Sequence, residues 1–163
     1  MARTMPRQKP GESEQDVQTP GEFLAPVQVR FGPIGLDLAA NGDNHVCPLW
    51  LGPGSPLAGG EDALAPALSW AGTPLRWLNP PFGDIEPWAR KCAEERHHAF
   101  IALLTPASVG SNWFTAHVHG KALVLALSPR LTFVSHSQSY PKDLILSVFG
   151  PLVCPGFDLW RWR

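Results

Sequence analysis

Residues 75–96 contain a strand, a rigid four-residue loop and a helix in immediate succession. Leu75-Arg76-Trp77-Leu78 is typical of a short buried strand, and Asp84 is a suitable N-cap for a helix over about 85–96 with Pro87 in its first turn. Between them lies Asn79-Pro80-Pro81-Phe82, in which each proline restricts the preceding residue to extended backbone. In an open α/β sheet, ligands bind where the carboxyl end of a strand leads into a loop and helix. We therefore predict an α/β domain with a site at this loop.

The same four residues carry groups suited to methylating a planar amino nitrogen, such as the exocyclic amine of adenine. The lone pair of this nitrogen is delocalised into the ring, so the nitrogen attacks poorly unless its N–H groups are polarised. The Asn79 side-chain oxygen and the Pro80 carbonyl, fixed by Pro81, can each accept one N–H. Phe82 offers a flat apolar face on which a base can stack. The alternative is a proline-rich turn without a chemical role, which is the commoner explanation for an isolated Asn-Pro-Pro.

With these residues the chain resembles the amino-group DNA methyltransferases that use S-adenosylmethionine, and most closely the small phage and prophage DNA N6-adenine methyltransferases. The resemblance runs from about Thr19 to Gly150. It implies a Rossmann-like sheet, mostly parallel with a C-terminal antiparallel hairpin, with S-adenosylmethionine as cofactor and DNA as partner. We expect a disordered tail over 1–18, a methyltransferase domain over 19–150 and a Trp/Arg tail over 151–163.

A first cofactor-binding segment is implied near the start of this region. Thr19-Pro20-Gly21-Glu22 resembles the family's Thr-Pro motif, which lies against the methionine end of the cofactor. The same residues also form a helix start, with Thr19 as N-cap, Pro20 at the first position and Glu22 closing a capping box. Capping alone would explain the pattern if it stood by itself.

A second cofactor-binding segment resembles the family's first strand, which ends in Leu-Asp-x-x-Ala. It lies within residues 31–40, and the resemblance implies that Asp37 meets a positive charge of the cofactor. Ala39 and Ala40 would let the backbone approach the cofactor. The alternative is an ordinary strand end with a solvated aspartate. The Gly-x-Gly of many methyltransferases is absent from this chain.

A third segment, Gly60-Glu61-Asp62-Ala63-Leu64, resembles the one whose aspartate accepts a hydrogen bond from the cofactor's adenine amine. The resemblance implies that Asp62 and Ala63 bind the cofactor, although Asp62 is equally suitable as a helix cap. No residue for the cofactor ribose stands out. The candidates are Asp43, Asn44 and Glu61.

The second half of the chain is typical of a buried sheet. The apolar run over 99–104 indicates a central strand covered on both faces. A helix over about 112–119, bounded by Ser111 and Gly120, is followed by strands over 121–127 and 143–149. Between these strands, residues 129–133 resemble the family's Gly-Arg-Leu-x-Phe region, which implies that Phe133 covers the opposite face of a flipped base from Phe82. Phe133 is equally suited to the core.

Composition and charge limit the partners. The 163 residues suffice for one α/β domain without a target-recognition domain of ordinary size, and 44% hydrophobic residues can bury a core. The formal net charge of −1 means that DNA binding must depend on local patches. Arg130 and Lys121 are the candidate phosphate contacts. Further cationic candidates are Arg90, Lys91, Arg96, His97, His98, Arg161 and Arg163.

Other classes of chemistry have little support in the sequence. Cys47, Cys92 and Cys154 are far apart, so we expect neither a zinc site nor a disulfide framework, and three unpaired cysteines fit a reducing cytoplasm. No apolar stretch is long enough to span a membrane. Two alternatives to DNA methylation stay open. One is methylation of an RNA base or a protein glutamine amide, which present the same planar NH2; the other is a non-catalytic relative that binds nucleic acid or cofactor. Recognition sequence and oligomeric state are not predicted.

Overall fold

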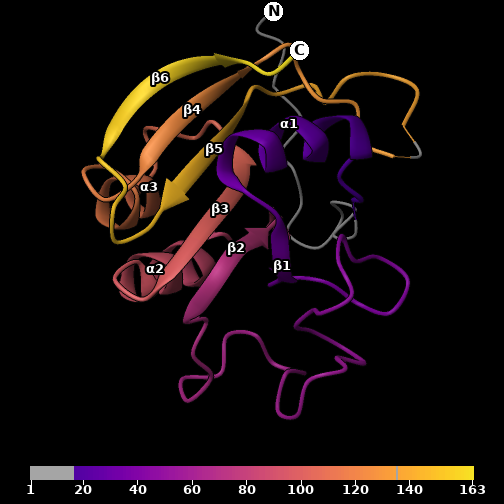
Figure 1. The fold of residues 1–163 in the computed structure, drawn as a ribbon. Helices are drawn as coiled ribbons and strands as arrows, with labels where there is room; N and C mark the ends of the chain where they lie inside the picture. Colours follow the sequence, from indigo (N-terminus) through magenta and orange to yellow (C-terminus); the bar gives the residue numbers. More distant parts are fainter. Residues whose placement is uncertain (1–16, 135) are drawn as a thin grey trace, which may run out of the picture.

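The computed structural model describes residues 17–134 and 136–163. Within these ranges the elements are α1 (Gly21–Phe31), β1 (Ile34–Asp37), β2 (Gly72–Leu78), α2 (Glu86–Glu95), β3 (Ala99–Pro106), α3 (Asn112–His117), β4 (Leu123–Ser128), β5 (Leu144–Phe149) and β6 (Gly156–Arg161). The strands form one mixed sheet in the order β1-β2-β3-β5-β4-β6. Figure 1 shows α1 on one face of this sheet and α2 and α3 on the other. The predicted α/β class is confirmed, as a mixed sheet between helices.

Strands β1, β2 and β3 are parallel, and their carboxyl ends lie at one edge of the sheet. The register places Asp37 beside Trp77 and Trp77 beside Ala102. Strand β5 lies between β3 and β4 and is antiparallel to both. The antiparallel pairing of β4 with β5 agrees with the predicted hairpin, but β6 follows these strands and pairs in parallel with β4.

Each face of the sheet is covered by its own hydrophobic cluster. On the α1 face, Phe23 and Val27 pack in a cluster with Trp77 of β2. On the other face, Ala89 of α2 and Phe114 of α3 lie in a cluster with the central strands. All of β5 and seven of the eight residues of β3 are buried. The prediction of a central strand over 99–104, covered on both faces, is confirmed.

Two helices begin differently from the prediction. Helix α1 starts at Gly21 with Pro20 as N-cap and without a side-chain cap bond among the described residues, so Thr19 does not cap it. The Thr19 hydroxyl instead accepts a hydrogen bond from Asn79, because the chain before Pro20 turns toward the end of β2. Helix α2 starts at Glu86 with Ile85 as N-cap, so the predicted Asp84 cap is wrong by one residue.

Helix α3 begins as predicted. The Ser111 side chain accepts a hydrogen bond from the Phe114 backbone N–H at 3.4 Å, which is the geometry of an N-cap. The helix ends at His117, two residues before the predicted end. Helix α1, with 11 residues, is the longest of the described part of the chain, and none of the helices there has the length and apolar character to cross a bilayer.

The C-terminal segment belongs to the sheet. Residues 156–161, which we expected to be part of a tail, form β6 and pair in parallel with β4. Trp162 is buried, packs edge-on against Phe23 and donates from Nε1 to the Pro129 carbonyl at 2.6 Å. At the other end, residues 1–16 of the predicted N-terminal tail lie outside the described residues.

Candidate functional site

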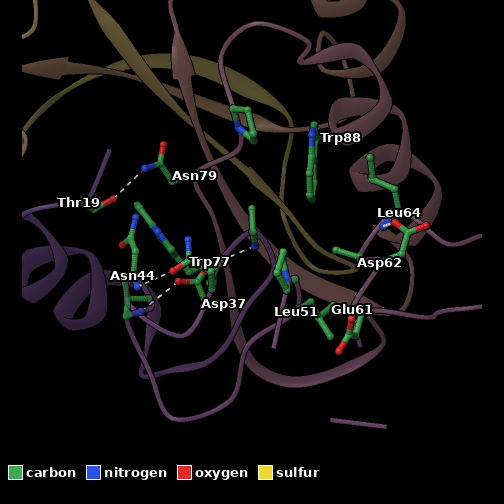
Figure 2. A pocket seen from close by; sticks show the side chains of 18 of the residues that line it. Thr19, Asp37, Asn44, Leu51, Glu61, Asp62, Leu64, Trp77, Asn79 and Trp88 are labelled. Atoms are coloured by element: carbon green, nitrogen blue, oxygen red, sulfur yellow. Dashed lines mark hydrogen bonds between the residues drawn. The ribbon is translucent and has the colours of Figure 1, made fainter. Parts of the chain in front are cut away.

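A cavity of about 440 Å³ opens at the carboxyl ends of β1 and β2, within the size range of small-molecule sites. The predicted site residues among its lining are Thr19, Asp37, Ala39, Ala40, Asp62, Ala63, Asn79 and Pro81. Figure 2 shows Asp37 and Asn79 on one side and Glu61 and Asp62 on the other. Pro20, Pro80, Phe82 and Phe133 are not part of the lining. The structure thus brings together distant segments, such as those of Thr19 and Asn79, which are 60 residues apart in sequence.

Asp37 supplies a buried carboxylate to the wall of this cavity. Its side chain accepts backbone hydrogen bonds from Ala39 at 3.3 Å and from Val46 at 3.0 Å, so its own loop holds it in place. Burial raises the pKa of Asp37 from 3.8 to about 6, although these two hydrogen bonds and the nearby His45 oppose the rise. Near neutral pH the cavity therefore has a fixed negative charge that a bound cation would stabilise.

The chain after β1 folds back closely beside the strand. The Asp37 N–H donates to the Leu49 carbonyl at 3.0 Å, and the Leu51 N–H donates to the Asp37 carbonyl at 2.7 Å. Gly52 has φ +132°, and a Cβ at this position would lie 2.0 Å from the Ala40 carbonyl oxygen. Only glycine allows this close approach. The two residues that approach each other, Ala40 and Gly52, both line the cavity.

Asp62 lies on the opposite wall, in a turn rather than at a helix start. Its Oδ1 accepts from the Leu64 N–H at 3.0 Å, and the next regular element after it is the strand β2 rather than a helix. The turn is anchored from behind by Trp70, which is fully buried and donates from Nε1 to the Ala63 carbonyl at 3.0 Å. Trp70 therefore supports the wall and does not line the cavity.

Lys91 of α2 holds the next part of this wall. Its ammonium donates to the carbonyls of Ala65 at 2.8 Å and Leu68 at 2.6 Å and lies 5.1 Å from the Trp70 ring. Burial lowers the pKa of Lys91. From the sequence alone we predicted this lysine to be one of the candidate DNA contacts. That prediction is wrong for Lys91, because its side chain is only 7% exposed and its donors face the inside of the domain.

Asn79 follows β2 directly and faces the cavity with its side-chain amide. The amide NH2 donates to the Val17 carbonyl at 2.8 Å and to the Thr19 hydroxyl at 3.3 Å. Pro81 also lines the cavity, while Pro80 is buried beside it. The loop thus places its asparagine at the carboxyl edge of the sheet, next to the strand end that carries Asp37.

The aromatic residues predicted to hold a base are in contact with each other. Phe82 is half-buried, and its ring centroid lies 6.4 Å from that of Phe133 and 5.8 Å from that of Tyr140. Phe133 is only 2% exposed, and the Phe82 and Phe133 planes meet at 61°. In this structure the two rings do not face one another across a gap. Of the two roles left open for Phe133, the structure favours the core.

The candidate phosphate contacts lie outside the cavity and have local partners. Arg130 donates from Nε to Asp143 at 2.8 Å, and its side chain is 50% exposed. Lys121 donates to the Ala116 carbonyl at 2.7 Å after the end of α3. Three of the other cationic candidates also have local partners: Arg90 pairs with Glu86, Arg96 with the Ala93 carbonyl, and Arg163 with Glu22.

Some lining residues were not predicted. Trp88 lines the cavity from α2 and also packs on Trp70, with ring centroids 6.4 Å apart. Its position in the first turn after the Asn-Pro-Pro-Phe loop is the signal that could have identified it. Of the candidates for a ribose contact, Asn44 and Glu61 line the cavity and Asp43 does not. Within the described ranges, no group of three or more His, Cys, Asp or Glu side chains could hold a metal ion.

Asp37, Asp62 and Asn79 thus line one cavity, and known proteins of similar sequence indicate the family of the chain. A family model described as DNA N-6-adenine-methyltransferase (Dam) matches residues 8–144. The chain belongs to the Dam family. All the predicted site residues lie within the matched range.

A relative of this Dam family chain is the DNA N-6-adenine-methyltransferase of Escherichia phage T1. It is 28% identical over 126 residues, which cover 77% of this chain and 50% of the phage protein. The chain thus spans about half the length of the curated relative that it matches. No solved structure matches the chain.

Proposed function

We propose that the chain is an S-adenosylmethionine-dependent methyltransferase that modifies the N6 amine of adenine in DNA, on a Rossmann-like sheet. The observation that carries this proposal is that Asn79 and Asp37 line one cavity at the carboxyl edge of parallel strands. Asn79 offers an acceptor for an amine, and Asp37 offers a negative charge for a cation. The Dam family match supports the same reaction.

The cavity residues fit S-adenosylmethionine. The buried Asp37 carboxylate would complement its positive charge, and Ala39 and Ala40 leave room beside the backbone. Asp62 would accept from its adenine amine, while Asn44 and Glu61 are the candidate partners of its ribose. When bound, the cofactor supplies a methyl group already activated by a positive sulfur.

The protein's contribution to the reaction is alignment and polarisation of the target amine. The Asn79 side-chain oxygen and the Pro80 carbonyl would each accept one N–H of that amine, which makes its nitrogen more nucleophilic. The nitrogen would form its new bond to the methyl carbon as the bond between that carbon and sulfur breaks, which leaves a neutral thioether, and the nitrogen would release one proton to solvent. Such alignment can contribute about 7–11 kcal/mol to lowering a reaction barrier.

An adenine inside a duplex must leave the base stack to reach this cavity, at a cost of roughly a few kcal/mol. Stacking on an aromatic ring is worth about 1–3 kcal/mol per base, and we assign this role to the half-buried Phe82. Arg130, with its half-exposed side chain, and Lys121 are the proposed phosphate contacts.

The test is incubation of the protein with tritiated S-adenosylmethionine and a mixture of DNA, RNA and protein, followed by identification of the labelled product. The proposal requires label in N6-methyladenine from DNA and a large loss of label with Asn79→Ala. Asn112→Ala, which removes an exposed asparagine from α3, is the matched control. Label in RNA or in glutamine would identify another substrate class, and cofactor binding without transfer would identify a non-catalytic relative.

A further inference from the structure

The two ends of the Asn79 side-chain amide differ in chemistry, and only the oxygen can serve the proposed reaction. Its NH2 faces the Val17 carbonyl at 2.8 Å and the Thr19 hydroxyl at 3.3 Å. A carbonyl can only accept hydrogen bonds, so Val17 requires the nitrogen on its side. Both ends are bonded to one planar carbon, and fixing the nitrogen therefore points the oxygen the other way. Figure 2 shows the Asn79 oxygen on the side of the amide away from Thr19.

The segment that supplies these partners is itself held on both sides. Thr19 is only 4% exposed. The carbonyl of Gln18 accepts from the Val134 N–H at 3.1 Å, which ties residues 17–19 to the loop after β4. Directly after them, the Pro20 carbonyl accepts from the N–H groups of Phe23 and Leu24 in the first turn of α1. The 17–19 segment is therefore a fixed support.

We propose that Thr19 and the Val17 carbonyl are positioning groups that keep the Asn79 oxygen directed to the target amine. An amide rotated by half a turn would present N–H groups to an amine that is itself a donor, and the amine would lose one acceptor. Both groups line the cavity, and in this role they would act on the target amine through Asn79. This inference rests on the proposed function and adds to it a role for Thr19 beyond lining the cavity.

The kinetic test uses Thr19→Val, which keeps the shape of the side chain and removes its hydroxyl. We expect kcat at saturating cofactor to fall about two- to tenfold, the rate equivalent of one ordinary hydrogen bond, while the Kd for S-adenosylmethionine changes by a smaller factor than kcat. Thr19→Ser should restore kcat. The matched control is Thr105→Val, since the buried Thr105 hydroxyl has no hydrogen-bond partner among the described residues. A raised Kd with normal kcat would show that Thr19 serves only the cofactor and would overturn the inference.

The Val17 contact is tested by Asn79→Asp. Aspartate keeps an acceptor for the target amine, but its ionised carboxylate has no N–H for the Val17 carbonyl, so an oxygen would face another acceptor. We expect kcat to fall by about tenfold or more. An aspartate variant as fast as the unmodified protein would show that the donor side of the amide has no role.

A measurement independent of turnover separates this inference from the proposed function. This measurement is a two-dimensional nitrogen–proton NMR spectrum. In it the Asn79 side-chain NH2 gives its own pair of cross peaks, which are assigned by their loss in Asn79→Asp. Thr19→Val should shift these peaks, and Thr105→Val should leave them in place. Unshifted peaks in Thr19→Val overturn the inference, even if the protein methylates DNA. Failure to label DNA removes the proposed function, while the shift of the peaks still decides whether Thr19 holds the amide.

Discussion

At the scale of single residues, the site depends on two polar side chains from adjacent strands. Asp37 ends β1 and Asn79 follows β2, and the pairing of Asp37 with Trp77 brings both to one cavity. Each is fixed by groups from its surroundings: Asp37 accepts from two backbone N–H groups, and Asn79 donates to Val17 and Thr19. In the proposed function, these contacts orient Asp37 for a cation and Asn79 for an amine.

Asn79→Ala should remove most of the methyl transfer while the fold and cofactor affinity are kept. Loss of one preorganised polar contact to the reacting group typically costs about 10²–10³ in rate. The measurement is a single-turnover assay at saturating cofactor beside calorimetry of cofactor binding. Near-normal turnover of this variant would remove Asn79 from the proposed mechanism.

The affinity for S-adenosylmethionine should rise as the pH is raised through about 6 and then level off, because Asp37 must lose its proton to complement the cation. The effect on the unliganded protein has the opposite sign. Folding raises the pKa of Asp37 from 3.8 to about 6, so its contribution to stability falls as the pH rises over that interval. Calorimetry between pH 5 and pH 8 measures the first effect. A pH dependence that persists in Asp37→Asn would have another origin.

Phe133→Ala should lower the free energy of unfolding by about 3–5 kcal/mol, because a buried aromatic side chain leaves a cavity when it is truncated.

Phe82→Leu should cost less stability but reduce methylation, since a leucine has no flat face for stacking. Urea unfolding and the labelling assay measure the two effects. If Phe133→Ala stays stable and loses activity mainly on paired DNA, its ring stacks on the base after all.

At the scale of elements, β6 closes the sheet beyond β4 although most of its own side chains are exposed. Phe157 and Leu159 are 63% and 56% exposed. The strand is held by its backbone pairing with β4 and by the tryptophans around it. Trp160 packs against Phe23 and Phe31, and Trp162 packs against Phe23. Helix α1 and the last strand therefore stabilise each other.

Trp162→Ala should destabilise the protein by about 3–5 kcal/mol, because its ring is buried and its indole N–H bonds the Pro129 carbonyl. Phe157→Ala is the control from β6, which directly precedes Trp162, and an exposed substitution of this kind should stay within about 0.5 kcal/mol. Chemical denaturation compares the two variants. Equal stabilities would mean that β6 and its tryptophans contribute little to the domain.

At the scale of the whole molecule, the long connection from β1 to β2 forms much of the cavity without regular elements. Residues 38–71 contain no helix or strand of the sheet, yet they supply Leu51, Gly52 and Asp62 to the lining. They are held by isolated contacts, such as those of Trp70 and Lys91. A ligand that contacts both this connection and the sheet can bind only the folded chain, and its binding therefore stabilises the folded state.

S-adenosylmethionine should therefore stabilise the whole domain. At a concentration of 100 times Kd, a ligand that binds only the folded state adds about 2.7 kcal/mol to the free energy of unfolding. Thermal or urea unfolding with and without cofactor measures this gain, and Asp37→Ala should reduce it at equal cofactor concentration. An unchanged midpoint in the unmodified protein would show that the cavity does not bind this cofactor.

The sequence by itself determined the central strands, the α/β class and the loop that carries the site. These features are local: the apolar runs over 99–104 and 144–149 require burial on both faces, and Pro80 restricts the Asn79 backbone whatever lies around it. Asp37 was predicted from the resemblance of its segment to the family's Leu-Asp-x-x-Ala strand end, and the structure places it at the end of β1 in the wall of the cavity.

Only the tertiary structure decided which residues meet around these features. The Val17 carbonyl reaches Asn79 across 62 residues, and no local pattern encodes that contact. Lysine is a residue type usually found at the surface, but Lys91 lies under the wall of the cavity. Strand β6 has too few buried side chains to show an alternating strand pattern in the sequence. Long-range packing sets these roles, because a side chain's partners depend on how distant segments are brought together rather than on its neighbours in sequence.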